Sequence, residues 1–179
     1  TFNAGDTYSS SGNVSIAHFP NGNILIAYQD VGDSYYGNFV IYDSAGNLVK
    51  SETTFKAAHI SWPSTTTLQN GNILITYGVN FPSKDNFVIY DSAGNEVVSE
   101  TTYNEGGTQH PSATTLTNGN ILIAYRDLGD SSYGKFVIYD SAGNLVKAET
   151  TFSATTSIPS VATLTNGNVL IAYNANSNG

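Results

Sequence analysis

One eight-residue pattern recurs four times in the chain, and its spacing constrains the fold more than any other feature. Asn-Gly-Asn followed by an apolar run, as in NGNILIAY, begins at Asn21 and returns about every 48 residues, at Asn70, Asn118 and Asn166. A period of this length is typical of repeat architectures. The fold therefore has to be built from stacked copies of one unit.

A second signature, FVIYDSAGN, begins at Phe39, Phe87 and Phe136, between the copies of the first. The two signatures share a Gly-Asn pair followed by aliphatic residues. The smaller module is therefore a β-hairpin of about 24 residues. The chain contains seven such turns, whose glycines are Gly22, Gly46, Gly71, Gly94, Gly119, Gly143 and Gly167.

The residues at these turns predict antiparallel β-structure throughout. Asn-Gly between apolar runs predicts a type I′ turn, which has positive φ at both central residues. Asp-Ser-Ala-Gly predicts a four-residue loop in which Asp43 accepts local backbone hydrogen bonds and Gly46 takes the left-handed conformation. No segment combines a helical period with capping residues.

The four strands of one unit differ in composition in an ordered way. The first is made of small residues, as in PSATTL from Pro111, and the fourth becomes polar, as in LVKSETTF from Leu48. The second and third, NILIAY and FVIY, are apolar at consecutive positions, which indicates burial on both faces. This order is typical of a propeller blade, with small residues at the axis and solvent at the rim.

We therefore predict an all-β fold, a β-propeller-like array of four-stranded blades of about 48 residues. One repeat domain spans residues 1–179, with blades at about 13–55, 62–103 and 111–152 and a half blade at about 159–174. A hairpin spiral or β-solenoid is the alternative, because it also accommodates seven hairpins. A β-trefoil would need three units and leave one hairpin over. TFNAG at residue 1 matches the ends of later units, so we expect the chain to be cut from a longer array.

The composition of the chain argues against some classes of binding partner. The chain is 40% hydrophobic with 12 Tyr and 8 Phe, enough for a core. Its net charge is −8 with only six Lys and Arg, which leaves no basic stripe for nucleic acid. No apolar run approaches the roughly 20 residues of a membrane span. An acidic, cysteine-free chain rich in Ser, Thr, Asn and Gly is expected to be extracellular or on the cell surface.

Two segments resemble known repeats. PSVATLTNGNVLIAY, from Pro159, is similar to the first two strands of bacterial extracellular propellers of the sialidase and Asp-box type, and FVIYDSAGNLV resembles the YD hairpin repeats of bacterial toxin shells. An Asp box reads Ser-x-Asp-x-Gly-x-x-Trp, whereas YDSAGNLV shifts the Asp and lacks the Trp. Sialidases use three arginines, and this chain has only Arg126. The resemblance implies a propeller fold and argues against transferring the activity.

The links between hairpins vary from repeat to repeat, whereas the turns within hairpins are nearly identical. DVGDSYYGN from Asp30 corresponds to GVNFPSKDN from Gly78, for example. Variation on one face of a regular scaffold is what a specific binding site would produce. On that face Trp62, the only tryptophan, corresponds to His110, and it is expected either to stack on a sugar ring or to cap the core.

The candidate binding residues all belong to these links or to the strands that they join. They are Trp62, His110, Tyr36, Tyr133, Arg126, Asp30 and Asp127. The paired carboxylates of DVGDS and DLGDS are also candidate calcium ligands, because calcium prefers oxygen donors. These carboxylates are Asp30, Asp33, Asp127 and Asp130. The other reading of the same turns is that the aspartates satisfy their own backbone.

No residue pattern indicates catalysis. The acidic turns are copied in two units, whereas a single active centre would be asymmetric, and no serine lies in a nucleophile-elbow context. We therefore predict that the chain is not an enzyme but a non-catalytic extracellular module for binding or adhesion, with a glycan or cell-surface ligand and without a cofactor unless calcium binds. Two alternatives remain. One is a self-associating structural unit completed through the half blade, and the other is a degenerate glycosidase-type propeller that takes one glycan at its axis.

Overall fold

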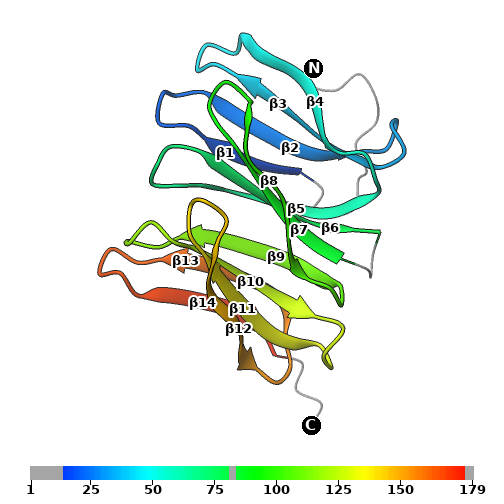
Figure 1. Cartoon of the computed structure of the whole chain (residues 1–179), viewed down its shortest axis with the longest axis vertical. Helices are drawn as coiled ribbons and strands as arrows, with labels where there is room; N and C mark the ends of the chain where they lie inside the picture. Colours follow the sequence, from blue (N-terminus) through cyan, green and yellow to red (C-terminus); the bar gives the residue numbers. More distant parts are fainter. Residues whose placement is uncertain (1–13, 81–83, 176–179) are drawn as a thin grey trace.

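The computed structural model describes residues 14–80 and 84–175, and within these residues all regular structure is β-strand. Fourteen strands follow one another along the chain, coloured from blue to red in Figure 1. Their bounds are β1 Val14–His18, β2 Ile24–Asp30, β3 Tyr36–Tyr42, β4 Leu48–Lys56, β5 Ile60–Thr67, β6 Ile73–Val79, β7 Lys84–Tyr90, β8 Glu96–Asn104, β9 Thr108–Thr115, β10 Ile121–Asp127, β11 Tyr133–Tyr139, β12 Leu145–Ser153, β13 Ser157–Thr163 and β14 Val169–Asn174.

The strands form three four-stranded sheets and one two-stranded sheet. Each sheet is an antiparallel meander in chain order, β1-β2-β3-β4, β5-β6-β7-β8, β9-β10-β11-β12 and β13-β14. In Figure 1 the first blade lies at the top, the second lies below it, and the third blade and the red half blade lie together at the bottom. The prediction of an all-β propeller-type array with three and a half blades is confirmed.

The Asn-Gly turns differ from the predicted type I′ geometry. Gly22 has φ +89°, but Asn21 does not have positive φ, so only one central residue is left-handed. The amide of Gly22 donates to Phe19 O at 2.9 Å and the amide of Phe19 donates to Asn23 O at 2.8 Å. This is a type I turn followed by a left-handed glycine, the three-residue hairpin loop, which needs only one positive φ.

The Asp-Ser-Ala-Gly turns keep the predicted roles of Asp43 and Gly46, but they close as the same three-residue loop rather than as the predicted four-residue loop. Asp43 Oδ1 accepts hydrogen bonds from the amides of Ala45 at 2.9 Å and Asn47 at 2.8 Å, and Gly46 has φ +83°. Gly46 N donates to Asp43 O at 3.0 Å. Both kinds of turn therefore build the same hairpin, as the shared Gly-Asn pair indicated.

The core lies between the sheets. All seven residues of β6 are buried, so this strand is covered on both faces. One apolar cluster joins the first blade to the second, with Leu25 and Ile75 among its members, and another joins the second blade to the third, with Leu74 and Ile123. Because alternate residues of β6 belong to different clusters, the second blade is packed on both of its faces.

Small side chains lie where the first strands meet at the axis. Ser15 Oγ and Thr65 Oγ1 are 2.9 Å apart, between the first and second blades. Thr114 Oγ1 and Thr163 Oγ1 are 3.2 Å apart, between the third blade and the half blade. Such short crossings require hydroxyls in place of bulky side chains, which explains the composition of the first strands.

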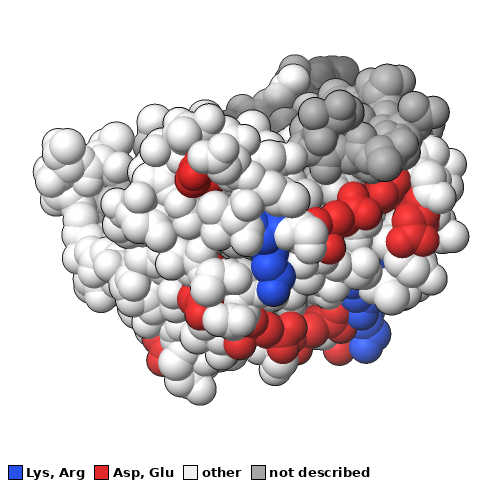
Figure 2. Space-filling model, turned by 90° about the horizontal axis from the view of Figure 1, so that it is seen from above, with Lys and Arg blue, Asp and Glu red and all other residues white. Residues whose placement is uncertain are grey.

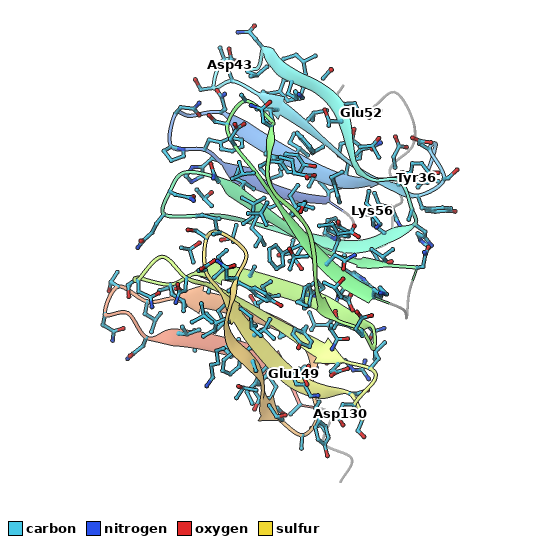
Figure 3. All side chains as sticks on the ribbon, viewed as in Figure 1. Tyr36, Asp43, Glu52, Lys56, Asp130 and Glu149 are labelled. Atoms are coloured by element: carbon cyan, nitrogen blue, oxygen red, sulfur yellow. The ribbon has the colours of Figure 1, made fainter. Side chains whose placement is uncertain are left out.

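A tyrosine on the second strand of each complete blade donates to a glutamate on the fourth. The pairs are Tyr28–Glu52, Tyr77–Glu100 at 3.0 Å and Tyr125–Glu149 at 2.7 Å. Lys56, at the end of β4, reaches the next blade and lies 2.6 Å from Glu100 Oε2. Figure 3 labels Glu52 and Lys56 on β4 and Glu149 on β12. The rim is therefore linked by polar contacts within and between blades.

The half blade exposes apolar side chains that are buried in the complete blades. Leu164 is 42% exposed and Leu170 is 54% exposed, whereas their equivalents Leu68 and Leu74 are 3% and 0% exposed. The predicted self-association through this half blade stays a prediction.

Candidate functional site

The variable links gather at one end of the blades, opposite the hairpin turns. In each complete blade the second strand ends there, the third begins there, and the link to the next blade starts there. In Figure 3, Tyr36 and Asp130 lie at this end, whereas Asp43 lies at the opposite end. We call it the link end. All the candidate binding residues predicted from the sequence belong to strands or loops at this end.

A repeated backbone irregularity shapes the axial part of the link end. Trp62, His110 and Ile158 each precede a proline and have φ of 49°, 50° and 38°. The strand register is interrupted beside Trp62 and Ile158, as a β-bulge requires. A residue before proline favours the extended region, and a β-branched residue rarely has positive φ. The scaffold thus holds three different side chains in one strained conformation, and strain of this kind is found most often at binding and catalytic sites.

These three residues line a hollow of about 300 Å³ at the axis. Val14 and three Pro-Ser pairs, 63–64, 111–112 and 159–160, complete the described lining. The rings of Trp62 and His110 are 4.9 Å apart and tilted by 47°. Burial, together with the positive charge of Arg126, lowers the pKa of His110. His110 is therefore neutral at pH 7, with one ring nitrogen to donate and one to accept.

Arg126 lies beside His110. Its Nη1 donates to Gln109 Oε1 at 2.8 Å and its Nη2 donates to Ser132 Oγ at 3.0 Å. The buried Nε has no hydrogen-bond partner among the described residues. The equivalent residue of the first blade, Gln29, instead donates to Ile60 O of the next blade. Of the predicted binding residues, Trp62 and His110 therefore line the hollow, whereas Arg126 does not line it but is bonded to Gln109, the residue before His110.

In the third blade, a lysine on β11 lies among the carboxylates of the acidic link turn. Asp127 Oδ2 is 2.9 Å and Asp130 Oδ2 is 2.7 Å from Lys135 Nζ, and Glu149 Oε1 is 2.6 Å from the same atom. Asp127 Oδ1 accepts the amide of Gly129 at 2.9 Å. The Lys135 ammonium therefore lies at the centre of the carboxylates proposed for calcium in the third blade, where it would repel a metal ion.

In the first blade the corresponding aspartates serve the turn. Asp30 Oδ1 accepts the amide of Gly32 at 2.9 Å, and Asp30 Oδ2 accepts Asn38 Nδ2 at 3.4 Å. Asp33 is exposed and accepts the amide of Tyr36 through its backbone carbonyl at 2.9 Å. Across residues 14–80 and 84–175, no three His, Cys, Asp or Glu side chains are grouped as metal ligands. The geometry favours the reading of these turns as Asx turns.

Tyr36 and Tyr133 lie apart from the axial hollow. Each is the first residue of a third strand and pairs with the aspartate that ends the second strand, Asp30 or Asp127. They occupy different blades and neither lines the hollow. The structure therefore places two of the seven predicted binding residues in the hollow, Arg126 beside His110, and the other four in two blade-internal pairs.

Sequence reasoning missed a buried polar group between the second and third blades. Asp85 is 1% exposed, and its Oδ2 has no hydrogen-bond partner among the described residues. Burial raises the pKa of Asp85 to about 7 and the nearby Asp127 carboxylate adds to this, although hydrogen bonds from Thr108 oppose the rise. Glycine stands at the equivalent position in the other two blades, Gly37 and Gly134. Alignment of the three repeats could have revealed this substitution.

The residues around Asp85 depart from the repeat together. Tyr103 and Thr108 stand where the first blade and its neighbour have Phe55 and Ile60. The Tyr103 hydroxyl lies 3.1 Å from Thr76 Oγ1, and alanine is the equivalent of Thr76 in the other two blades. A polar network at the junction of the second and third blades thus replaces the apolar packing found between the first and second blades.

Comparison with known proteins relates the chain to carbohydrate-active propellers by fold. No family model and no curated protein sequence matches it. An ulvan lyase, a polysaccharide lyase solved bound to -[GlcA(1-4)Rha3S]-, has a TM-score of 0.64 at 14% identity, over 97% of this chain and 48% of that chain. The α-L-arabinanase of Penicillium chrysogenum, complexed with arabinobiose, has a TM-score of 0.61 at 16% identity, over 94% and 58%.

The exo-β-1,3-galactanase of Phanerochaete chrysosporium, solved with galactose, has a TM-score of 0.61 at 12% identity, over 99% of this chain and 46% of that chain. The chain therefore spans about half the length of these neighbours. The likeness establishes propeller-type repeats.

The comparisons correct two of the functional predictions. We predicted a non-catalytic module for binding or adhesion and no enzyme activity. The proteins that share the arrangement of blades are instead an arabinanase, a galactanase and a polysaccharide lyase, so both predictions are wrong in their main form. The findings favour the alternative of a degenerate glycosidase-type propeller.

No helix in the described part of the chain is long and apolar enough to cross a membrane.

Proposed function

We propose that the chain belongs to a carbohydrate-active propeller of the degenerate glycosidase type, which takes one polysaccharide chain at the axial hollow of the link end. The observation that carries the proposal is the hollow itself, where Trp62 and His110 from neighbouring blades lie 4.9 Å apart. An indole ring packs against the apolar face of a sugar, while an imidazole and serine hydroxyls exchange hydrogen bonds with its hydroxyl groups.

The different side chains at equivalent positions support a single asymmetric site. Trp62, His110 and Ile158 share one backbone conformation but offer an aromatic, a titratable and an aliphatic side chain. A lectin with one subsite in each blade would repeat the same side chain. We therefore expect one sugar chain to cross the hollow, with each blade contacting a different part of it.

Among the described residues that line the axial hollow, one side chain can accept a proton near neutral pH. Paired carboxylates, which most glycosidases use, are absent from the described residues that line the hollow. The neutral His110 ring is the group in that lining that can accept a proton near pH 7. We propose that His110 contacts the reacting region of the sugar. We also propose an extracellular location, because a polysaccharide is too large to enter a cell intact.

Trp62 provides a direct test, because it is the only tryptophan of the chain. Its fluorescence is titrated with oligosaccharides from arabinan, galactan and ulvan, and product release from each polysaccharide is followed in parallel. We expect a saturable shift in emission with one substrate, and loss of product release in His110→Ala. Ser44→Ala, in an exposed turn at the opposite end, is the matched control and leaves both signals unchanged.

Trp62→Phe and Trp62→Ala separate stacking from folding. Phenylalanine retains an aromatic face, so binding measured by calorimetry weakens only slightly, whereas alanine weakens it about tenfold. If no polysaccharide shifts the Trp62 emission or releases a product, the proposed function is wrong.

A further inference from the structure

The charge of Arg126 is not compensated within the described part of the chain. Three of the lysines, Lys56, Lys84 and Lys135, lie within 4 Å of a carboxylate, whereas no carboxylate lies within that distance of the Arg126 guanidinium. The chain carries 14 acidic residues against six basic ones, so carboxylates are plentiful. An unpaired, partly buried guanidinium in so acidic a protein is costly to keep.

The hydrogen bonds of Arg126 leave much of its donor capacity free. A guanidinium has five N–H groups. One is used by Gln109 and one by Ser132, and both acceptors are neutral. Three remain without a partner among the described residues, including the buried Nε–H. Planar N–H pairs of this kind match a carboxylate or a sulfate oxygen pair.

The equivalent residues of the other two blades show what the position of Arg126 does where its role is only structural. In the first blade Gln29 bridges to the backbone of the second blade, and in the second blade the position is Gly78. Arg126 bonds only to side chains of its own blade, so it does not replace the bridge made by Gln29. Arg126 does not line the axial hollow, but its Nη1 donates to Gln109, the residue before His110, and its charge contributes to the lowered pKa of the His110 ring that does line it.

We infer that the axial site is specific for an acidic glycan, in which Arg126 binds the anionic group of one sugar while Trp62 packs against a neighbouring ring. The anionic group is a uronate carboxylate or a sulfate ester, since both present paired oxygens. The described residues that line the hollow include no Asp or Glu, so nothing in that lining repels such a group. This inference rests on the proposed function and adds the substrate class.

The test compares ligands that differ only in charge. Oligogalacturonide and its methyl ester, and a sulfated galactan fragment and its desulfated form, are titrated against the whole chain with Trp62 emission and calorimetry as readouts. We expect the acidic member of at least one pair to bind about tenfold more tightly than its neutral form. Preference within the first pair identifies a carboxylate, and preference within the second identifies a sulfate.

Arg126→Gln introduces the residue of the first blade, and Lys147→Gln, which removes an exposed charge on β12, is the matched control. We expect the acidic ligand to bind about tenfold more weakly to Arg126→Gln, while the neutral ligand changes by less than about twofold. Arg126→Lys retains the charge without the planar fork and is expected to be intermediate. Urea unfolding confirms that each variant is folded.

Different results would overturn the inferred specificity for acidic glycans and the proposed function. Equal binding of the acidic and neutral members of both pairs overturns the inference and leaves the proposed glycan site standing. Equal weakening by Arg126→Gln and Lys147→Gln also overturns it, because the effect is then one of net charge. If no glycan of either kind shifts the Trp62 emission, the proposed function itself fails.

Discussion

Ionisation of Asp85 is predicted to make the protein less stable as the pH rises. The side chain is 1% exposed at the junction of the second and third blades, and burial raises its pKa to about 7. In the unfolded chain the pKa is near the ordinary value of 3.8. Of the groups around it, the Asp127 carboxylate disfavours ionisation, whereas Thr108 donates to the charged form.

The size of this effect on the free energy of unfolding follows from the linkage between proton binding and folding. Below about pH 4 Asp85 is protonated in both states and has no effect. Between about pH 4 and 7 the unfolded chain loses this proton while the folded chain keeps it, so the free energy of unfolding falls by about 1.4 kcal/mol per pH unit. The shift of about three pKa units therefore costs about 4 kcal/mol above pH 7. This sign is opposite to that of an aspartate in a salt bridge.

The assay is urea unfolding of the wild type and Asp85→Asn between pH 4 and 8, followed by Trp62 emission. Carboxylates that do not interact with Asp85 contribute equally to both proteins, so the difference between their unfolding free energies isolates Asp85 together with its interaction with Asp127. We expect this difference to move by about 4 kcal/mol in favour of the variant from pH 4 to 8. Asp85→Gly, which restores the glycine of the other blades, checks the trend. A difference that stays within about 0.5 kcal/mol across this range would refute the reasoning.

Three further substitutions test the packing and the strain. Lys135→Asn, which introduces the residue of the other blades, leaves Asp127 without its counter-ion and is expected to cost about 3 kcal/mol at pH 7 and less at pH 4, measured by thermal unfolding. Ile158→Gly relieves positive φ at a site that is 60% exposed and should raise stability by about 1 kcal/mol in urea. Gly134→Ala places a Cβ about 2.2 Å from Thr156 Oγ1 and should cost at least about 1 kcal/mol, with unchanged stability as the contrary result.

The fold could be predicted because the residues that specify it are repeated. Seven glycines at regular spacing fix the hairpins, and the composition of the four strands gives the order from axis to rim. The exact turn type was missed because Asn21 can adopt either sign of φ, and the hydrogen bonds of Phe19 decide between the two. Local sequence therefore determined the module, whereas loop closure determined its geometry.

The site was only partly predictable, because its members belong to different blades. Trp62 and His110 were singled out by their equivalent positions, and the structure brings their rings together. The position of Lys135 among three carboxylates follows from the pairing of β10, β11 and β12, which spacing alone does not reveal. The glycosidase-type propeller was only an alternative in the sequence analysis because copied acidic turns were the only carboxylates with a visible pattern. Figure 2, viewed from above, shows how far acidic side chains outnumber basic ones on that face, so acidity alone marks no site.

The stoichiometry of glycan binding, measured by calorimetry with the tightest oligosaccharide from the titrations, tests the central claim most directly. A single axial site predicts one glycan for each chain, with heat and Trp62 emission saturating together, and with affinity measured by calorimetry about tenfold weaker in Trp62→Ala. Several equivalent glycans for each chain, or binding that leaves Trp62 unaffected, would place the ligand on the repeated blades and contradict the account.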